Sequence, residues 1–172
     1  MRTVDRYAVA VHSHNLRSDA RTSASDADLL AAAGLASKRS PVGLALMRIN
    51  AGDPHEAARL VEVLAGMLVG KAWHSDREKL PRDEARTMAA QLLAWHLDRS
   101  CPHCAGRGFP KVNGAPALGS NPCRHCHGTG RRDPQDAVPH ARRWLVRWLQ
   151  AELEREAGFA APAVERTLGG DA

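Results

Sequence analysis

The chain has 172 residues, of which 44% are hydrophobic, 25% are charged and only 4% are aromatic. This composition is ordinary for a globular protein, and no apolar run approaches the length that spans a bilayer or serves as a secretory signal. We therefore predict a cytoplasmic protein with one domain, or one domain with a subdomain. Alanine and leucine supply most of the apolar content, which favours a mainly helical fold.

The formal net charge is +5, and it is unevenly distributed along the chain. Residues 99–147 contain nine Lys or Arg and two Asp or Glu, whereas residues 51–98 and 148–172 are each net acidic. A concentrated basic excess is typical of a surface that contacts a polyanion, most simply nucleic acid. The alternative is a solvated basic surface without a partner.

The N-terminal half is predicted to begin with a flexible segment, residues 1–22, which shows no useful periodicity. Residues 23–99 are predicted to form a helical domain that starts with two short helices. Ser25 is the predicted cap of the first of these helices. Pro41 suits the first turn of the second, and Gly52 is its predicted end.

Two longer helices follow within the same predicted domain. The first begins at Asp53-Pro54, where aspartate caps and proline takes the first helical position. Its apolar residues recur at helical spacing, at Ala57, Leu60, Val61, Leu64, Leu68 and Ala72. The second begins at Pro81 and is predicted to continue to Arg99. Together they predict a helical bundle or hairpin.

The last long helix is predicted within residues 133–158, as a C-terminal amphipathic helix with Leu145, Leu149 and Leu153 on its apolar face. Gly158 is a natural helix stop. Residues 159–172 are therefore predicted to form a tail.

All four cysteines lie in residues 100–132, a segment rich in glycine and proline that cannot be one continuous helix. The pattern Cys-x-x-Cys-x-Gly-x-Gly occurs twice, in CPHCAGRG and in CRHCHGTG. Two such pairs, separated by the 18 residues 105–122, supply the four ligands of a tetrahedral zinc site. We predict an inserted zinc hairpin between long helices, with the ligands Cys101, Cys104, Cys123 and Cys126.

The predicted ion is a single structural Zn²⁺, because four thiolates leave no open position for water or substrate. The glycines let the backbone turn with positive φ, which directs amide N–H groups toward the thiolates. An iron–sulfur cluster and a redox dithiol are the alternatives. Neighbouring His103, His125 and His127 could replace a ligand, but a complete cysteine set leaves them on the surface.

No motif indicates catalysis, since the chain has no phosphate-binding loop, dinucleotide fingerprint, nucleophile elbow or catalytic carboxylate pair. We therefore expect no enzymatic activity, no catalytic residue and no small-molecule substrate. Residues 26–50 have the spacing of a helix-turn-helix, although the second helix is short and largely apolar. The candidate DNA-binding residues are instead basic side chains of the hairpin and the helix after it: Arg107, Lys111, Arg124, Arg131, Arg132, Arg142, Arg143 and Arg147.

The doubled cysteine motif resembles part of the zinc region of DnaJ-type co-chaperones, which carry four such motifs and a J domain with a His-Pro-Asp tripeptide, both absent here. The chain more closely resembles the lambda-type Q late-gene antitermination proteins of bacteriophages. The similarity rests on ARTSASDADLLAAAGLASKRSPVGLALM, on CPHCAGRGF and CRHCHGTGRR, and on the order of elements over roughly residues 12–155. The loop between the two cysteine motifs is shorter here.

That resemblance implies a protein that binds late-promoter DNA and engages paused, sigma-containing RNA polymerase near its flap and RNA exit channel. It implies a polymerase modified to read through pauses and terminators, in some cases with NusA, in the cytoplasm of a bacterial host. By position, the four cysteines would be the zinc ligands. Two alternatives remain open: a zinc-stabilised DNA-binding regulator that acts at initiation only, and a DnaJ-like zinc co-chaperone module.

Overall fold

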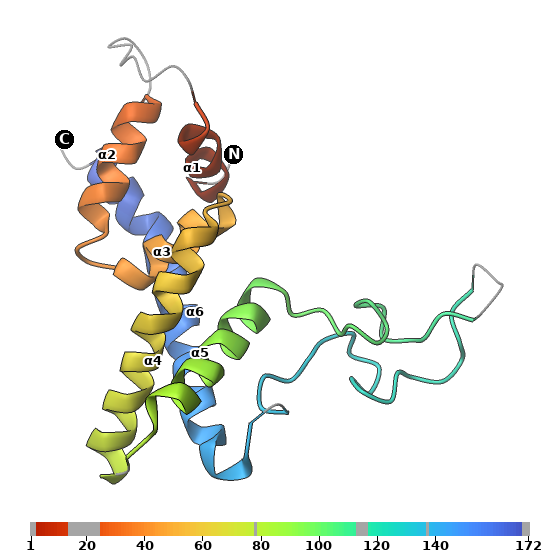
Figure 1. Ribbon diagram of the computed structural model, residues 1–172. Helices are drawn as coiled ribbons and strands as arrows, with labels where there is room; N and C mark the ends of the chain where they lie inside the picture. Colours follow the sequence, from red (N-terminus) through yellow and green to blue (C-terminus); the bar gives the residue numbers. More distant parts are fainter. Residues whose placement is uncertain (1–2, 14–24, 78, 113–116, 137, 170–172) are drawn as a thin grey trace. The chain divides into compact units, whose positions relative to one another are not determined.

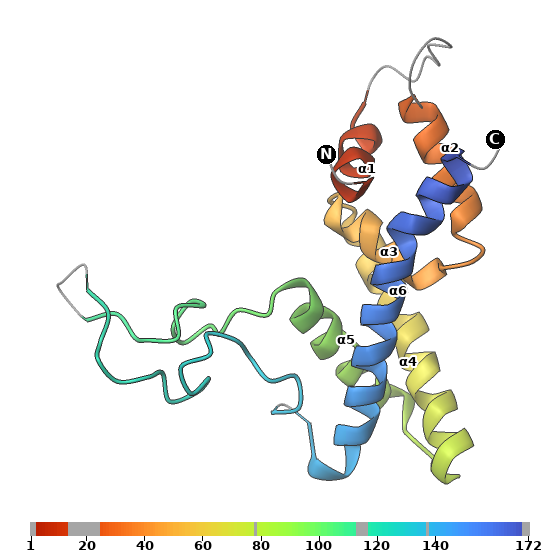
Figure 2. The same ribbon diagram turned by 180° about the vertical axis from the view of Figure 1, so that it is seen from behind.

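The computed structural model describes residues 3–13, 25–77, 79–112, 117–136 and 138–169. These residues are mainly helical, as predicted, and the only β pairing among them is two isolated bridges, Ser100–Arg131 and Lys111–Leu118. The elements in chain order (Figures 1 and 2) are α1 (Thr3–Val11), α2 (Asp26–Ala36), α3 (Pro41–Asn50), α4 (Pro54–Asp76), α5 (Arg82–Leu97), the short 3-10 helix η1 (His140–Arg142) and α6 (Arg143–Gly169).

The chain divides into two compact units, one formed by residues 1–64 with 151–172 and the other by residues 65–150. The cysteine motifs belong to the second unit. This division differs from the predicted boundaries, which kept residues 23–99 together and treated the C-terminal residues as an isolated helix and a tail. The reason is that α4 and α6 are long enough to contribute to both units.

The predicted caps at the starts of α2 and α4 are present in the structure. Ser25 and Asp28 form a reciprocal capping box, in which the Asp28 amide donates to Ser25 Oγ (3.2 Å) and the Ser25 amide donates to Asp28 Oδ2 (2.9 Å). At the start of α4, Asp53 Oδ1 accepts hydrogen bonds from the amides of His55 (3.0 Å) and Glu56 (3.3 Å). Each carboxylate satisfies amide groups that the first helical turn leaves unpaired.

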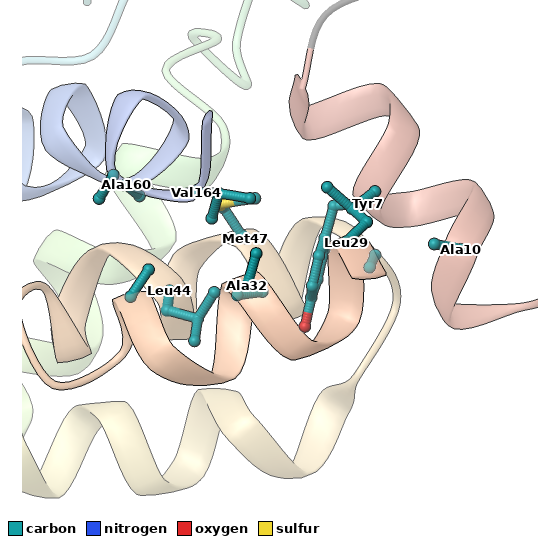
Figure 3. Close-up of a cluster of buried hydrophobic side chains, with 12 residues drawn as sticks. Tyr7, Ala10, Leu29, Ala32, Leu44, Met47, Ala160 and Val164 are labelled. Carbon is teal, nitrogen blue, oxygen red and sulfur yellow. The ribbon is translucent and has the colours of Figure 1, made fainter. Parts of the chain in front are cut away.

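The core of the first unit is built largely from small side chains. α1 packs against α2 and α3, and α2 packs against α3. Figure 3 shows Tyr7 of α1 and Leu29 of α2 in the same buried cluster as Ala160 and Val164 of α6. At Gly43 of α3, a Cβ would collide with the backbone carbonyl oxygen of Glu156, so glycine permits the close approach of these two helices.

The predicted flexible N-terminus is wrong for residues 3–11, which form α1; residues 14–22 lie outside the described residues. The helix forms there because Tyr7 and Ala10 are only 4% and 1% exposed in the core of the first unit. This stabilisation comes from contacts with α2 and α3, which are distant in the sequence and leave little trace in the local periodicity.

The predicted tail is also wrong over its first part, because α6 continues through Gly158 and past Pro162 to Gly169. Pro162 removes one backbone hydrogen bond from the helix interior. Burial of Ala160, Ala163 and Val164 offsets this loss, since all three lie in the core of the first unit.

The second unit contains the predicted α5, which ends two residues before the expected Arg99. Its buried residues are Ala85, Met88, Ala89, Leu92, Leu93 and Trp95. Among the helices of the described ranges, none combines the length and the apolar content needed to cross a bilayer.

Candidate metal centre

The four cysteines converge in the second unit, as the doubled motif predicts. Their Sγ atoms all lie within 4.8 Å of one another, and all four side chains are buried free thiols. A tetrahedral ion with metal–sulfur bonds of about 2.3 Å would place neighbouring sulfurs roughly 3.8 Å apart. The Sγ atoms of Cys104 and Cys126 are 3.7 Å apart. The cysteine set therefore fits one metal ion.

Each Cys-x-x-Cys pair is followed by a turn with positive φ. In the first motif, Gly106 and Gly108 have φ of 78° and 80°, and in the second, Gly128 and Gly130 have φ of 87° and 71°. The turns place the Gly108 amide 3.3 Å from Cys104 Sγ and the Gly130 amide 3.3 Å from Cys126 Sγ, with each amide donating. The predicted role of the glycines is confirmed: they direct N–H dipoles at the sulfurs.

The two motifs also bind each other reciprocally through the backbone. The Cys101 amide donates to the carbonyl of Gly130 (2.8 Å), and the Cys123 amide donates to the carbonyl of Gly108 (2.7 Å). A Cβ at Gly108 would collide with the carbonyl oxygen of Gly128, and a Cβ at Gly130 with that of Gly106. The second glycine of each motif is thus required for the close approach of the two turns.

His103 and His125 occupy equivalent positions in the two motifs and stack on each other. Their ring centroids are 3.4 Å apart and the ring planes differ by 10°. The prediction that the two side chains lie on the surface agrees with their exposure. Their mutual contact was not predicted, although the shared spacing Cys-x-His-Cys was a usable signal.

The thiols of Cys104 and Cys126 share a hydrogen bond and titrate differently in the absence of a metal. Burial raises the pKa of Cys104 to about 11, against the opposing hydrogen bond from the Gly108 amide. At Cys126 burial acts in the same direction, but hydrogen bonds from the Gly130 amide and from Cys104 and Cys123 outweigh it and lower the pKa to about 7. A metal ion binds the thiolate form of cysteine, so metal binding releases the protons of those thiols that are still protonated.

The cysteine segment is attached to the end of α5 by several hydrogen bonds. Trp95 Nε1 donates to the carbonyl of Arg132 (2.8 Å), whose amide donates to the carbonyl of Arg99 (2.9 Å). The Arg132 guanidinium donates to the carbonyls of Asp98 and Ala94, at the C-terminal end of α5. A cation at this end of a helix is favourable, and Arg132 therefore has a structural role.

The predicted DNA-binding residues fall into two groups. Arg132 and Arg142 serve the fold, the latter through an ion pair in which its Nε lies 2.7 Å from Glu84 Oε1. Arg143 is half-buried, and no hydrogen bond of its Nε is found among the described residues. The exposed members are Arg107, Lys111, Arg124, Arg131 and Arg147.

Arg99, which was not among the predicted DNA-binding residues, lies close to the exposed Arg131. Arg99 and Arg131 both line a shallow polar cavity of about 510 Å³, together with Ser100, Gly106, Thr129 and Gly130. The position of Arg99, two residues before Cys101, was the available signal. The helix-turn-helix interpretation of residues 26–50 finds no support. A recognition helix must place side chains in a DNA groove, whereas α3 is buried from Val42 to Met47.

Compared with known proteins, the chain matches no protein-family model, no curated protein and no solved structure.

Proposed function

We propose that the four cysteines hold one structural Zn²⁺ and that residues 100–132 act as a zinc hairpin inserted between the long helices α5 and α6. Among the described residues of this segment, the only buried ones are the four cysteines, Gly108 and Gly130. Such a segment has no apolar core of its own, and a metal bound by four thiolates can supply one. A closed set of four ligands supports a structural and not a catalytic ion.

We propose that the hairpin contacts DNA. The observation that carries this proposal is the combination of a rigid, closed metal site with exposed basic side chains around it, at Arg107, Lys111, Arg124 and Arg131. Basic side chains on a rigid support can neutralise phosphates at defined positions. The excess of seven positive charges in residues 99–147, nine basic against two acidic, supports the same interpretation.

We further propose that the protein is a transcription antitermination factor of the phage Q kind, without catalytic activity. Its partners would be late-promoter DNA and sigma-containing RNA polymerase near the flap and RNA exit channel, with NusA as a further partner. The resemblance in the opening segment and in the cysteine motifs supports the proposed engagement of RNA polymerase. The exposed basic residues of the proposed zinc hairpin support the proposed binding to late-promoter DNA.

The test is single-round transcription through a terminator, from the late promoter adjacent to the gene. Terminator readthrough with purified holoenzyme, and binding to the promoter DNA, are both measured for the wild-type protein, for Cys101→Ser and for Arg107→Ala/Arg124→Ala. The matched control is Arg59→Ala/Arg166→Ala, which removes the same charge from exposed positions outside the hairpin.

Terminator readthrough that requires both the intact cysteine set and Arg107/Arg124 would support the antitermination function. Promoter binding with unchanged termination would replace it with a regulator that acts at initiation only. Failure of the wild-type protein to bind the promoter would reject the DNA proposal. Equal loss of activity in the control pair would reject the assignment of DNA contacts to the hairpin.

A further inference from the structure

A cavity of about 390 Å³ lies beside the cysteine cluster, within the second unit. Its wall is formed by the last turns of α5, by both cysteine motifs and by the residues that follow the second motif. The residues that matter below are Ala94, Trp95, His103, His125, Arg131 and Asp136. Its volume is at the lower end of the range for small-molecule sites, and is sufficient for a nucleobase.

Three aromatic rings of this wall are held in place. Trp95 is fixed by its hydrogen bond to the Arg132 carbonyl and by the Arg99 guanidinium, which lies 4.5 Å from the ring centroid. The stacked rings of His103 and His125 line the same cavity. Rigid aromatic rings are the surfaces on which unpaired bases stack, and the same wall carries two arginines and two aspartates.

A carboxylate also lines the cavity. Asp133 Oδ1 already accepts a hydrogen bond from the Gln135 amide (2.8 Å). Asp136 lines the same cavity and is exposed. An Asp or Glu oxygen can accept a hydrogen bond from the exocyclic amino group of cytosine, whereas thymine presents a carbonyl oxygen at the corresponding position.

A second, polar cavity adjoins the first at Arg131. Arg131 lines both the 390 Å³ cavity and the polar cavity of about 510 Å³ that it shares with Arg99. Two guanidinium groups are well suited to a phosphodiester, because each presents several N–H donors in a planar array. A base in the first cavity could therefore have its own phosphate in the second.

We propose that the cavity binds one unpaired nucleobase, with cytosine preferred over thymine, while Arg99 and Arg131 bind the adjacent phosphate. The inference rests on the proposed function, since it takes nucleic acid as the ligand. It adds that the protein recognises a site where one strand is locally unpaired.

The binding of an unpaired base is tested first, with the full chain loaded with zinc and three otherwise identical DNA duplexes. One is fully paired, one carries a single bulged cytosine and one carries a bulged abasic nucleotide, which has the same backbone but no base. We expect the bulged cytosine to be bound about tenfold more tightly than the abasic bulge, the effect of one stacked base. Duplex binding itself reports separately on the proposed function.

The cavity is tested with two leucine substitutions on the same helix. Ala94→Leu fills part of the cavity at an exposed position, and Ala90→Leu, exposed but outside the cavity, is the control. We expect Ala94→Leu to remove the preference for the bulged cytosine and to keep duplex binding. Ala90→Leu should keep both.

The carboxylate is tested through the ratio of affinities for a bulged cytosine and a bulged thymine. We expect the wild-type protein to prefer cytosine about fivefold. Asp136→Ala should bring this ratio to about one, because it removes the acceptor. The general gain in DNA affinity from removing a negative charge cancels in the ratio.

Three results would overturn the inference. Equal affinity for the cytosine and abasic bulges, with duplex binding intact, would reject the base cavity and leave the proposed function standing. A preference that survives Ala94→Leu would place the base elsewhere on the protein. Binding to none of the duplexes would reject the base cavity and the DNA-binding proposal together.

Discussion

The helical core of the first unit and the cysteine hairpin of the second keep their residues buried by different means. In the first, twelve buried side chains from several helices form one cluster, and most of them are alanines. In the described part of the cysteine segment, the buried hydrophobic cluster consists of the four cysteines. Stability in the helical core is the sum of many weak contacts, whereas in the proposed zinc hairpin it would depend on a few strong bonds to one ion.

The difference predicts how each region tolerates change. A core of small side chains loses a limited amount of stability when one side chain is truncated. A metal site loses its geometry when one ligand is removed, and its turns also depend on glycines at fixed positions. The comparison can therefore be tested by perturbing each region and measuring both.

Removal of the metal should have the largest effect. Four-thiolate zinc sites in small modules contribute about 10 kcal/mol or more of free energy, so a chelator or Cys101→Ser should unfold the hairpin. Amide hydrogen exchange of residues 101–112 and 117–131 should become fast, while α2 and α3 stay protected. Ala117→Ser, an exposed change in the same segment, is the control. Simultaneous loss of protection in α2 would show that the two regions unfold as one.

Leu29→Ala perturbs the other region. Leu29 is 1% exposed in the core of the first unit, and its truncation should cost about 3 kcal/mol of unfolding free energy. Denaturant unfolding measures this loss, and zinc affinity measured against a competing chelator should not change. Leu35→Ala, at an exposed position of the same helix, should be nearly neutral. A matching fall in zinc affinity for Leu29→Ala would contradict the separation of the two regions.

Gly130→Ala tests the close approach of the two cysteine motifs. The new Cβ would collide with the carbonyl oxygen of Gly106. The alanine would also have to adopt the φ of 71° that Gly130 has, which costs about 2 kcal/mol for the backbone alone. Zinc affinity should fall by about thirtyfold or more, since 1.4 kcal/mol corresponds to a factor of ten. Gly34→Ala is the matched control, because a Cβ at Gly34 of α2 has no neighbour within 4 Å. Unchanged zinc affinity in Gly130→Ala would reject the steric account.

The smallest effect concerns pH and the cap of α2. Side-chain and backbone hydrogen bonds from Ser25 lower the pKa of Asp28. A carboxylate with a lowered pKa stabilises the fold above its ordinary pKa, and this stabilisation is lost as the pH falls through the folded-state value. Protection of the α2 amides should therefore decrease below about pH 4 in the wild-type protein.

The decrease should be smaller in Asp28→Ala than in the control Asp26→Ala, which changes the same helical turn but leaves the bond to Ser25 intact. An equal pH response of both variants would reject this role of Asp28. Zinc release on acidification depends on protonation of the cysteine thiolates and not of this carboxylate. The hairpin should therefore lose its amide protection at a higher pH than the first turn of α2.

Much of the local structure was predictable because its cause lies within a few residues. Ser25 with Asp28, and Asp53 with Pro54, mark helix starts through hydrogen bonds that span one turn. The doubled cysteine motif places two pairs of ligands in the same way, because a turn of four residues brings two sulfurs together.

The basic residues were predictable only in part. Composition shows an excess of charge in residues 99–147, but not which arginines reach solvent. Arg132 donates to the carbonyls of Ala94 and Asp98 at the C-terminal end of α5, and Arg142 pairs with Glu84; these partners are dozens of residues away in the sequence. Arg131, directly beside Arg132, remains exposed.

The sequence by itself determined the helical class, the starts of α2 to α5 and the four-cysteine cluster, since each follows from short-range spacing. The tertiary structure decided the rest. It made a helix of residues 3–11 and extended α6 past Gly158, because burial of Tyr7, Ala160 and Val164 outweighs weak local preferences. It also stacked His103 on His125 and formed the cavity beside them, because both depend on how the two cysteine motifs close on each other.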